Sequence, residues 1–279
     1  MVVNRNNKKI LCEHVFVRES CIGGDTLDAI TILLLSLLSF LAGFIDSVAG
    51  GGGLILIPSL LLAGIPPQVA LGTNKFAAIF GTSTALVNFM KNGKVIWEIA
   101  GFGLAFSIMG SVIGTKAILY FDQNTTAKII VMMLPITVIV TFLPKRRLKE
   151  SISDFSKKDL YLYTPLLCSI VGFYDGFFGP GTGTFLIFGF YIFLGIHLIH
   201  ASAISKVFNL ASNAGSFVTF AFADKVLYGI GIPIAIANLA GGYLGSILAI
   251  KKGQRFIKAS LLIVFGILFI TLIHRIWPR

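Results

Sequence analysis

Long apolar runs dominate the chain, and short polar or glycine-rich segments separate them. Several runs have about 20 residues, and a helix of that length, rising about 1.5 Å per residue, crosses a hydrocarbon core of about 30 Å. The pattern therefore predicts membrane-spanning helices. In the first half the expected helical segments are 26–46, 54–63, 67–90, 95–120 and 127–143.

The second half repeats this plan, with expected segments at 160–178, 184–194, 201–222, 226–250 and 256–273. Individual residues recur at an offset of 129 (175 − 46) early in each half and of 131 (206 − 75) later, as a two-residue insertion would produce. Because the matching residues occur in the same order in both halves, we infer an internal duplication. The matching positions are Gly43, Phe44, Asp46, Gly50, Gly52, Lys75, Gly110 and Gly114 in the first half, and Gly172, Phe173, Asp175, Gly179, Gly181, Lys206, Gly241 and Gly245 in the second.

These features predict an all-α, polytopic transmembrane helical bundle of about eight spans, built from two homologous repeats that each contain a glycine-interrupted helix. The segment 54–63 is too short to cross unaided, so we expect a re-entrant or partial helix there. The expected organisation is a polar N-terminal tail, a first transmembrane repeat, a basic link and a second transmembrane repeat. Their boundaries are 1–25, 26–143, 144–158 and 159–279.

Composition and charge support a membrane protein. Hydrophobic residues make up 56% of the 279 positions and charged residues only 13%, more apolar surface than a soluble domain can hide. The net charge is +11, and the basic residues lie in short segments between apolar runs. This placement is typical of loops that orient a protein in the lipid bilayer, its expected partner, and no nucleic acid is expected. We expect the tail and the link to be cytoplasmic, although Lys251, Lys252, Arg255 and Lys258 would then face outward.

Four ionisable residues lie within apolar runs, where a charge is costly and usually faces a cavity or a partner: Asp46, Asp175, Lys75 and Lys206. Lys206 shares one helical face with Asn209 and Asn213, three and seven residues further on, and the equivalent positions after Lys75 are Ala78 and Thr82. The polar residues that we expect to contribute to a substrate site are Asn74, Lys75 and Thr82 in the first half, and Ser205, Lys206, Asn209 and Asn213 in the second.

The two glycine-rich breaks are the other expected part of a site. Each interrupts an apolar run and exposes backbone N–H groups at the start of a short helix, where partial positive charge can receive an anion. Together with the lysines they predict an electropositive pocket for a small anion. The glycines concerned are Gly50, Gly51, Gly52, Gly53, Gly179, Gly181 and Gly183.

Structural interpretations remain open for these residues. Asp46 and Asp175 either take part in substrate or ion binding or pair with the lysines as structural ion pairs. The glycines of the breaks could serve close packing alone, which is the favoured interpretation for Gly110 and the other G-x-x-x-G positions. No cofactor or metal is expected, because His197 and His200 have no third ligand spaced to join them.

The motifs resemble those of the TauE/SafE family, also called the 4-toluene sulfonate uptake permease family, over about residues 30 to 273. The resemblance implies a secondary transporter of small anions such as sulfite, sulfoacetate or sulfonates. It rests on AGFIDSVAGGGG at 42–53 with Gly72-Thr73-Asn74-Lys75, and on Gly172-Phe173-Tyr174-Asp175-Gly176 through Gly179-Pro180-Gly181-Thr182-Gly183 with Ser205, Lys206 and Asn209.

The expected function is therefore secondary transport of a small anionic substrate, with a proton or sodium ion as a candidate coupling partner. A passive anion channel is an alternative, since basic pore residues would serve it too. A membrane-embedded enzyme is less favoured, because Asp46 and Asp175 are far apart in sequence and have no adjacent histidine or cysteine. No oligomeric state is predicted.

Overall fold

The computed structural model describes residues 21–22, 25–26, 28–142 and 158–276, including the side chains of 28–133, 158 and 160–252. Apart from two short antiparallel strands, β1 (Cys21–Ile22) and β2 (Asp25–Thr26), the described chain is helical, which confirms the all-α class. The helices are α3 (Ala29–Ala49), α4 (Gly53–Leu62), α5 (Pro67–Lys91), α6 (Trp97–Leu119), α7 (Gln123–Phe142), the π-helix η1 (Asp159–Tyr163), α8 (Thr164–Phe177), α9 (Thr182–Phe193), α10 (Leu198–Phe222) and α11 (Tyr228–Ile276).

Glycine and proline set several of these boundaries. Gly50 ends α3 in the left-handed region at a φ of 81°, and its N–H donates to the Asp46 carbonyl at 2.8 Å. Pro67 begins α5, where its missing N–H is not needed. One boundary differs from the expectation: α11 continues through the polar stretch after Ile250, because Lys, Gln and Arg favour a helix.

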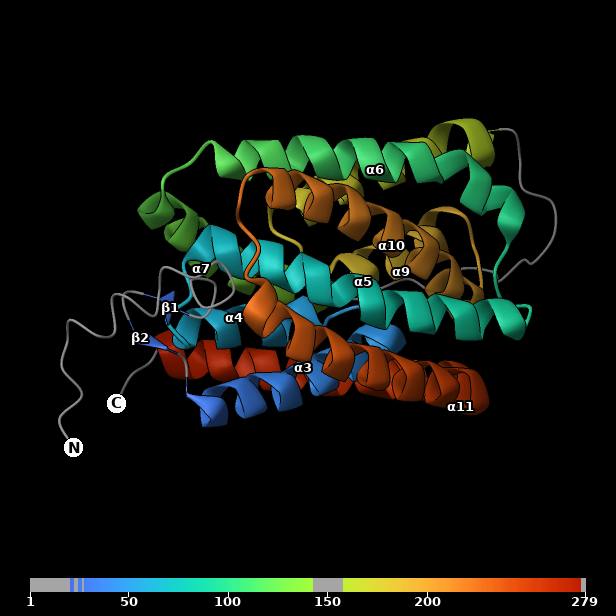
Figure 1. Ribbon diagram of the computed structural model, residues 1–279. Helices are drawn as coiled ribbons and strands as arrows, with labels where there is room; N and C mark the ends of the chain where they lie inside the picture. Colours follow the sequence, from blue (N-terminus) through green and yellow to red (C-terminus); the bar gives the residue numbers. More distant parts are fainter. Residues whose placement is uncertain (1–20, 23–24, 27, 143–157, 277–279) are drawn as a thin grey trace, which may run out of the picture.

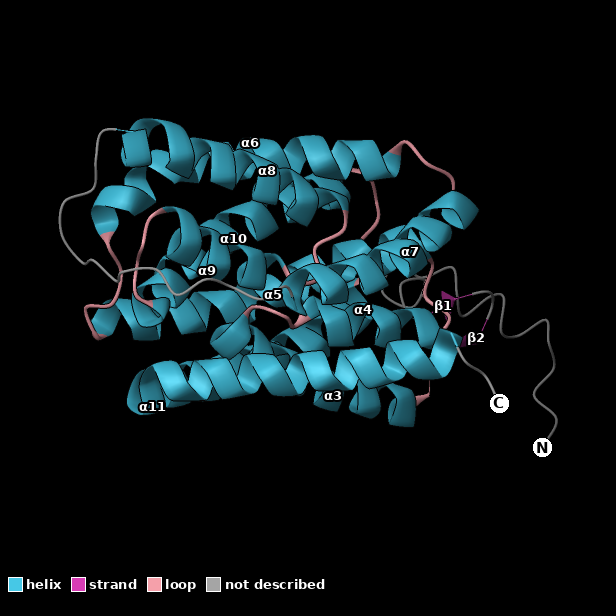
Figure 2. Ribbon diagram, turned by 180° about the vertical axis from the view of Figure 1, so that it is seen from behind, coloured by secondary structure: helices cyan, strands magenta, loops and turns pink. Residues whose placement is uncertain are grey.

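The helices form three layers (Figures 1 and 2). Helices α6 and α8 form one outer layer, α3 and α11 the other, and α5 and α10 lie between them. The short helix α4 packs on α3 and α5, while α9 packs on α8 and α10. The central helices are therefore covered on both sides, and their polar residues lie inside the bundle.

Inter-helix contacts define the direction of each helix. Ser39 Oγ donates to the Ile234 carbonyl at 2.7 Å and Gly245 lies on Phe44, so α3 and α11 are parallel. By the same reasoning α5 is parallel to α11, and α6, α8 and α10 are mutually parallel. The two sets are antiparallel, because Gly72 lies on Lys225 whereas Lys75, further along α5, contacts Asn213.

The expected cytoplasmic placement of the 1–25 tail and the 144–158 link stays a prediction, because most of both segments lies outside the described residues. Helices α3 and α8 are antiparallel, so they begin at opposite ends of the bundle (Figure 1). In sequence, α3 follows the 1–25 tail and α8 follows the 144–158 link. The expectation assumed an even number of crossings in the first half, but α4 returns the chain so that α5 runs parallel to α3.

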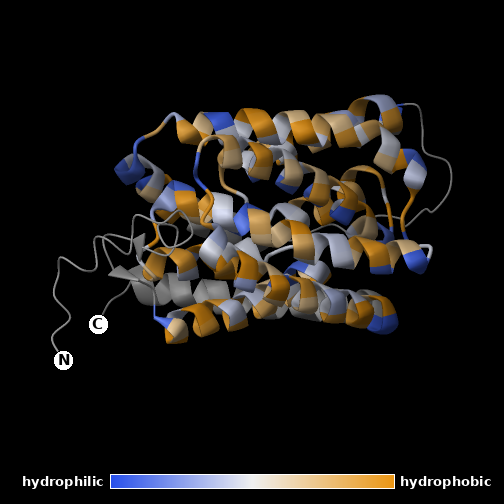
Figure 3. Cartoon of the chain, in the orientation of Figure 1, coloured by the Kyte–Doolittle hydropathy of each residue, from blue (hydrophilic) through white to orange (hydrophobic). Residues whose placement is uncertain are grey.

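Three helical segments in the described chain are long and apolar enough to cross a membrane: Ala29–Ala49, Trp97–Leu119 and Tyr228–Lys252. This does not confirm the expected count of about eight. Helices α5 and α10 have 25 residues each, but buried polar residues lower their hydropathy. Apolar side chains cover much of the outer surface (Figure 3), with Leu33 70% and Ile236 64% exposed, as expected for contact with lipid.

Glycines allow the outer helices to pack closely. A Cβ on Gly110 would lie 2.9 Å from the Phe173 nitrogen, and one on Gly114 would lie 2.8 Å from the Phe177 nitrogen. Gly241 and Gly245 make the corresponding backbone contacts on α3. The packing interpretation of the G-x-x-x-G positions is therefore confirmed.

We expect Gly110→Ala to lower the free energy of unfolding by about 1–3 kcal/mol, because its methyl group overlaps the α8 backbone. The matched control is Gly101→Ala in the same helix, where a Cβ meets nothing within 4 Å. That variant should be at least as stable as the wild type, since alanine favours a helix. Thermal unfolding of the purified proteins in detergent measures both, and equal midpoints would contradict the packing account.

Candidate functional site

The two buried lysines occupy equivalent places in the central helices. Lys75 is the ninth residue (75 − 66) of α5 and Lys206 the ninth (206 − 197) of α10, and their exposures are 2% and 0%. Helices α5 and α10 are antiparallel, and the Lys75 side chain extends to the residue seven positions (213 − 206) after Lys206. Accordingly, Lys75 Nζ donates to Asn213 Oδ1 at 3.1 Å.

Each lysine forms an ion pair with an aspartate from the other half of the chain. Lys75 Nζ lies 2.6 Å from Asp175 Oδ1, and Lys206 Nζ lies 3.6 Å from Asp46 Oδ2. Lys206 Nζ also donates a hydrogen bond to the Asp46 carbonyl. Of the two interpretations left open by the sequence, ion pairing of the aspartates with the lysines is therefore present.

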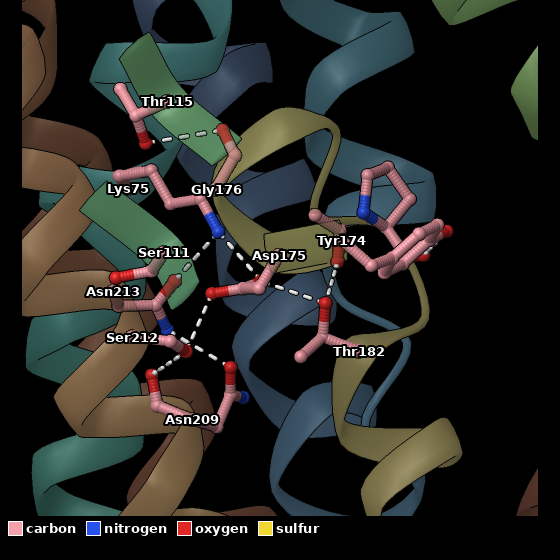
Figure 4. A network of polar contacts seen from close by, with 12 residues as sticks. Lys75, Ser111, Thr115, Tyr174, Asp175, Gly176, Thr182, Asn209, Ser212 and Asn213 are labelled. Carbon is pink, nitrogen blue, oxygen red and sulfur yellow. Dashed lines mark hydrogen bonds and ion pairs between the residues drawn. The ribbon is translucent and has the colours of Figure 1, made fainter. Parts of the chain in front are cut away.

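The Asp175 half-site consists of Asp175, Lys75, Thr182, Ser212 and Asn213 (Figure 4). Thr182 Oγ1 donates to Asp175 Oδ1 at 2.7 Å, and Ser212 Oγ donates to Asp175 Oδ2 at 2.6 Å. Both side chains of the ion pair are only 2% exposed. Every carboxylate oxygen here has a short contact with a donor, so the half-site is closed.

The Asp46 half-site consists of Asp46, Lys206, Asn209 and Gly52. The Gly52 N–H donates to Asp46 Oδ1 at 3.3 Å, and Asn209 Nδ2 donates to Asp46 Oδ2 at 3.5 Å. The Asp46 side chain is 19% exposed. This carboxylate is therefore held by longer contacts than Asp175 and is open to its surroundings.

Two carboxamides connect the half-sites. Asn213 accepts from Lys75 and donates through Nδ2 to Asn209 Oδ1 at 3.2 Å, and Asn209 in turn donates to Asp46. A continuous polar chain therefore runs from Lys75 to Asp46 through the centre of the bundle, and Figure 4 shows its Lys75 end.

The two glycine-rich breaks contact each other, which the sequence did not reveal. Gly50, at the end of α3, lies on Gly183 near the start of α9, and a Cβ on either would overlap the other's backbone. Thr184 Oγ1 donates to the Ala49 carbonyl at 2.7 Å across this contact. Gly181, with a φ of 83°, precedes α9 in a conformation that favours glycine.

The other residues that the sequence assigned to the site differ in how directly they contact it. Gly179 approaches Lys75, since a Cβ there would lie 3.0 Å from Nζ, and Gly53 faces Pro180. Asn74 and Ser205 are buried, and Ser205 Oγ donates to the Ser202 carbonyl within its own helix. Gly51 is buried between α3 and α4.

Sequence reasoning missed Thr182 and Ser212 as partners of Asp175. Their positions in the sequence could have identified them, since Thr182 lies within the second glycine-rich break and Ser212 directly precedes Asn213. Within the described part of the chain, no three or more His, Cys, Asp or Glu residues gather in a way that could hold a metal ion.

A multi-pass helical membrane protein with a buried, charge-paired polar site is the class that this fold and site define. The family model described as "Sulfite exporter TauE/SafE" matches residues 35–272. The chain therefore belongs to the TauE/SafE family of membrane transporters, as its motifs suggested.

Relatives with similar names support this assignment. A "Probable membrane transporter protein ORF9" from Sinorhizobium sp is 36% identical over 86% of this chain and 93% of its own length. The "Probable membrane transporter protein YfcA" of Escherichia coli K12 is 35% identical over 90% and 93%. "Sulfite exporter TauE/SafE family protein 5" of Arabidopsis thaliana is 34% identical, over 36% of this chain and 23% of its own. No solved structure matches the chain significantly.

We expect Lys75→Met to lower the free energy of unfolding by roughly 3–5 kcal/mol, because it leaves the buried Asp175 carboxylate without its counter-charge. Adding Asp175→Asn should recover most of that loss. Thermal unfolding in detergent would measure the three proteins, with Lys116→Met, an exposed lysine of α6, as the control. A double variant no more stable than the single one would argue against the ion pair.

Proposed function

We propose that the protein is a secondary transporter of small anions, sulfite or related sulfur-containing anions among them, and that the substrate binds at the buried Lys–Asp cluster. The observation that carries this proposal is the presence of two enclosed ammonium groups beside glycine-rich helix starts, deep in a membrane protein. Membership of a family described as sulfite exporters supports the substrate class. The names of the relatives favour transport over catalysis.

We further propose that segments 26–143 and 159–279 are inverted repeats, with about eight spans in all. Two observations support this. Gly43 lies on Asn238 as Gly172 lies on Ser107, and α3 and α8, which occupy equivalent positions, run in opposite directions. Inverted repeats with a site at their interface are the architecture of many secondary transporters that work by alternating access.

Charge balance favours coupling to a cation. The cluster contains two lysines and two aspartates and is formally neutral, so an added anion leaves one buried negative charge. A proton or a sodium ion entering with the substrate would cancel it. Asp46, the more exposed carboxylate, is the proposed acceptor.

The distribution of basic residues supports a revised topology, in which the end of the bundle that carries the 144–158 link is cytoplasmic. Lys91 ends α5 and Lys251 lies level with it on the parallel α11, since Asn88 of α5 bonds Ser246 of α11. The start of α8, with Lys158, lies at the same end. The charges of the link and of Lys251 then point to one side, as the positive-inside rule requires.

We expect a cysteine at Asn92, at this end, to resist an impermeant thiol reagent added to intact cells, while one at Tyr120, at the opposite end, is labelled. The background would lack Cys12, Cys21 and Cys168. Tyr120 is 91% exposed and Asn92 is also exposed, so accessibility within the protein does not limit the reaction. Labelling of Asn92→Cys in intact cells would reverse the assignment, and permeabilised cells, in which both sites should react, are the control.

We expect reconstituted protein to accumulate sulfite above its equilibrium level when an inward proton or sodium gradient is imposed, because a coupled transporter uses the gradient to move its substrate uphill. Radiolabelled uptake with and without an ionophore would measure this. The control replaces all four charges, through Lys75→Met, Asp175→Asn, Lys206→Met and Asp46→Asn, and should show no uptake. Uptake that stops at equilibrium under every gradient would favour the channel alternative.

A further inference from the structure

We infer that the two half-sites are unequal: the anion binds in the Asp46 half-site, to the Lys206 ammonium and the Thr82 hydroxyl, whereas the Lys75–Asp175 pair holds the two halves of the chain together. This inference rests on the proposed function, because it names which half of the cluster receives the substrate.

Side chains that complete the Asp175 half-site are absent at the equivalent positions around Asp46. By the offsets of 129 and 131, Thr182 corresponds to Gly53 (182 − 129) and Ser212 to Gly81 (212 − 131). The two hydroxyls that donate to Asp175 at 2.6 and 2.7 Å therefore have no counterpart at Asp46. The Asp46 carboxylate lacks the donors that would hold it in place.

Thr82 provides independent evidence for a ligand. Its hydroxyl is buried, with the residue 2% exposed, and Oγ1 has no hydrogen-bond partner. A buried hydroxyl without a partner is unfavourable, and a bound acceptor would satisfy it.

The position of Thr82 places it at the Asp46 half-site. It lies seven residues (82 − 75) after Lys75, which puts both on the face of α5 that meets α10. Thr82 is the equivalent of Asn213 in the first half (213 − 131), and Lys206 is the equivalent of Lys75 in the second. Because Asn213 contacts Lys75, the symmetry of the antiparallel pair places Thr82 next to Lys206. Thr82 replaces Asn213 at this point, and its shorter side chain leaves Lys206 without the matching amide contact.

The chemistry of the Asp46 half-site suits a small oxyanion. Its groups other than Asp46 are donors: the Lys206 ammonium, the Thr82 hydroxyl, the Gly52 N–H and the Asn209 carboxamide. The carboxylate of Asp46 accepts from three of them at 3.3–3.6 Å, longer than well-formed charged hydrogen bonds. A substrate oxyanion can take the place of this loosely held carboxylate and gain the Thr82 hydroxyl as a further donor.

The first experiment measures the rise in unfolding temperature that sulfite, sulfate and acetate each cause in the purified protein. We expect Thr82→Val to weaken the apparent affinity for the stabilising anion by about tenfold, without loss of stability in the anion-free protein. The matched control is Thr126→Val on α7, which removes another buried, unpartnered hydroxyl outside the half-sites. It should keep the wild-type affinity.

The second experiment compares the two ion pairs, each neutralised on both sides so that no charge is stranded. Lys206→Met with Asp46→Asn should abolish the anion-induced shift. Lys75→Met with Asp175→Asn should unfold at a temperature above that of Lys75→Met alone and somewhat below that of the wild type, while the anion-induced shift persists.

Three results would overturn the inference. Equal affinities for Thr82→Val and Thr126→Val would remove the hydroxyl from the site. A shift lost only when the Lys75 pair is neutralised would assign the anion to the Asp175 half-site and leave the proposed function intact. A wild-type protein that none of the three anions stabilises, and that takes up none of them, would reject the inference together with the proposed function.

Discussion

A buried ammonium group inside an apolar bundle requires an opposite charge, and the architecture of this protein depends on how its two central lysines obtain one. Each lysine takes its aspartate from the other half of the chain, so separating the halves would strand four charges at once. The crossed pairs connect α5 with α8 and α10 with α3. They hold the interface between the halves at the depth where the polar chain lies.

Close backbone contact makes this crossed pairing possible. Glycines on α6 and α11 let them pack closely against α8 and α3, the helices that carry the two aspartates. At the centre, Gly50 and Gly183 allow the two helix breaks to touch, and Thr184 joins them by a hydrogen bond. Glycines therefore serve two purposes: some pack the outer helices together, and others bring the two helix breaks into contact at the centre.

The sequence predicted the helical class, the packing role of the G-x-x-x-G glycines and the four charges within apolar runs, because each depends on residues within one helix or one motif. It did not predict which aspartate meets which lysine, since periodicity defines the face of a helix and not its neighbour. The direction of α8 relative to α3 was also beyond it, because composition does not show that α4 returns the chain. The sequence also did not predict the role of Thr182 and Ser212, because their hydroxyl groups meet Asp175 only in the folded protein.

Divergence between the two half-sites has a physical rationale under the proposed function, in which an anion competes for one carboxylate while the two halves of the chain stay together. If both carboxylates were held loosely, displacing one would leave no firm contact between the halves, and if both were enclosed, no anion could compete. Here the enclosed Asp175 keeps its two hydroxyl donors while Asp46 accepts longer bonds. Asn209 contacts Asp46 directly and Lys75 through Asn213, and Ser212 bonds both Asp175 and the Asn209 carbonyl, so the two half-sites remain connected through α10.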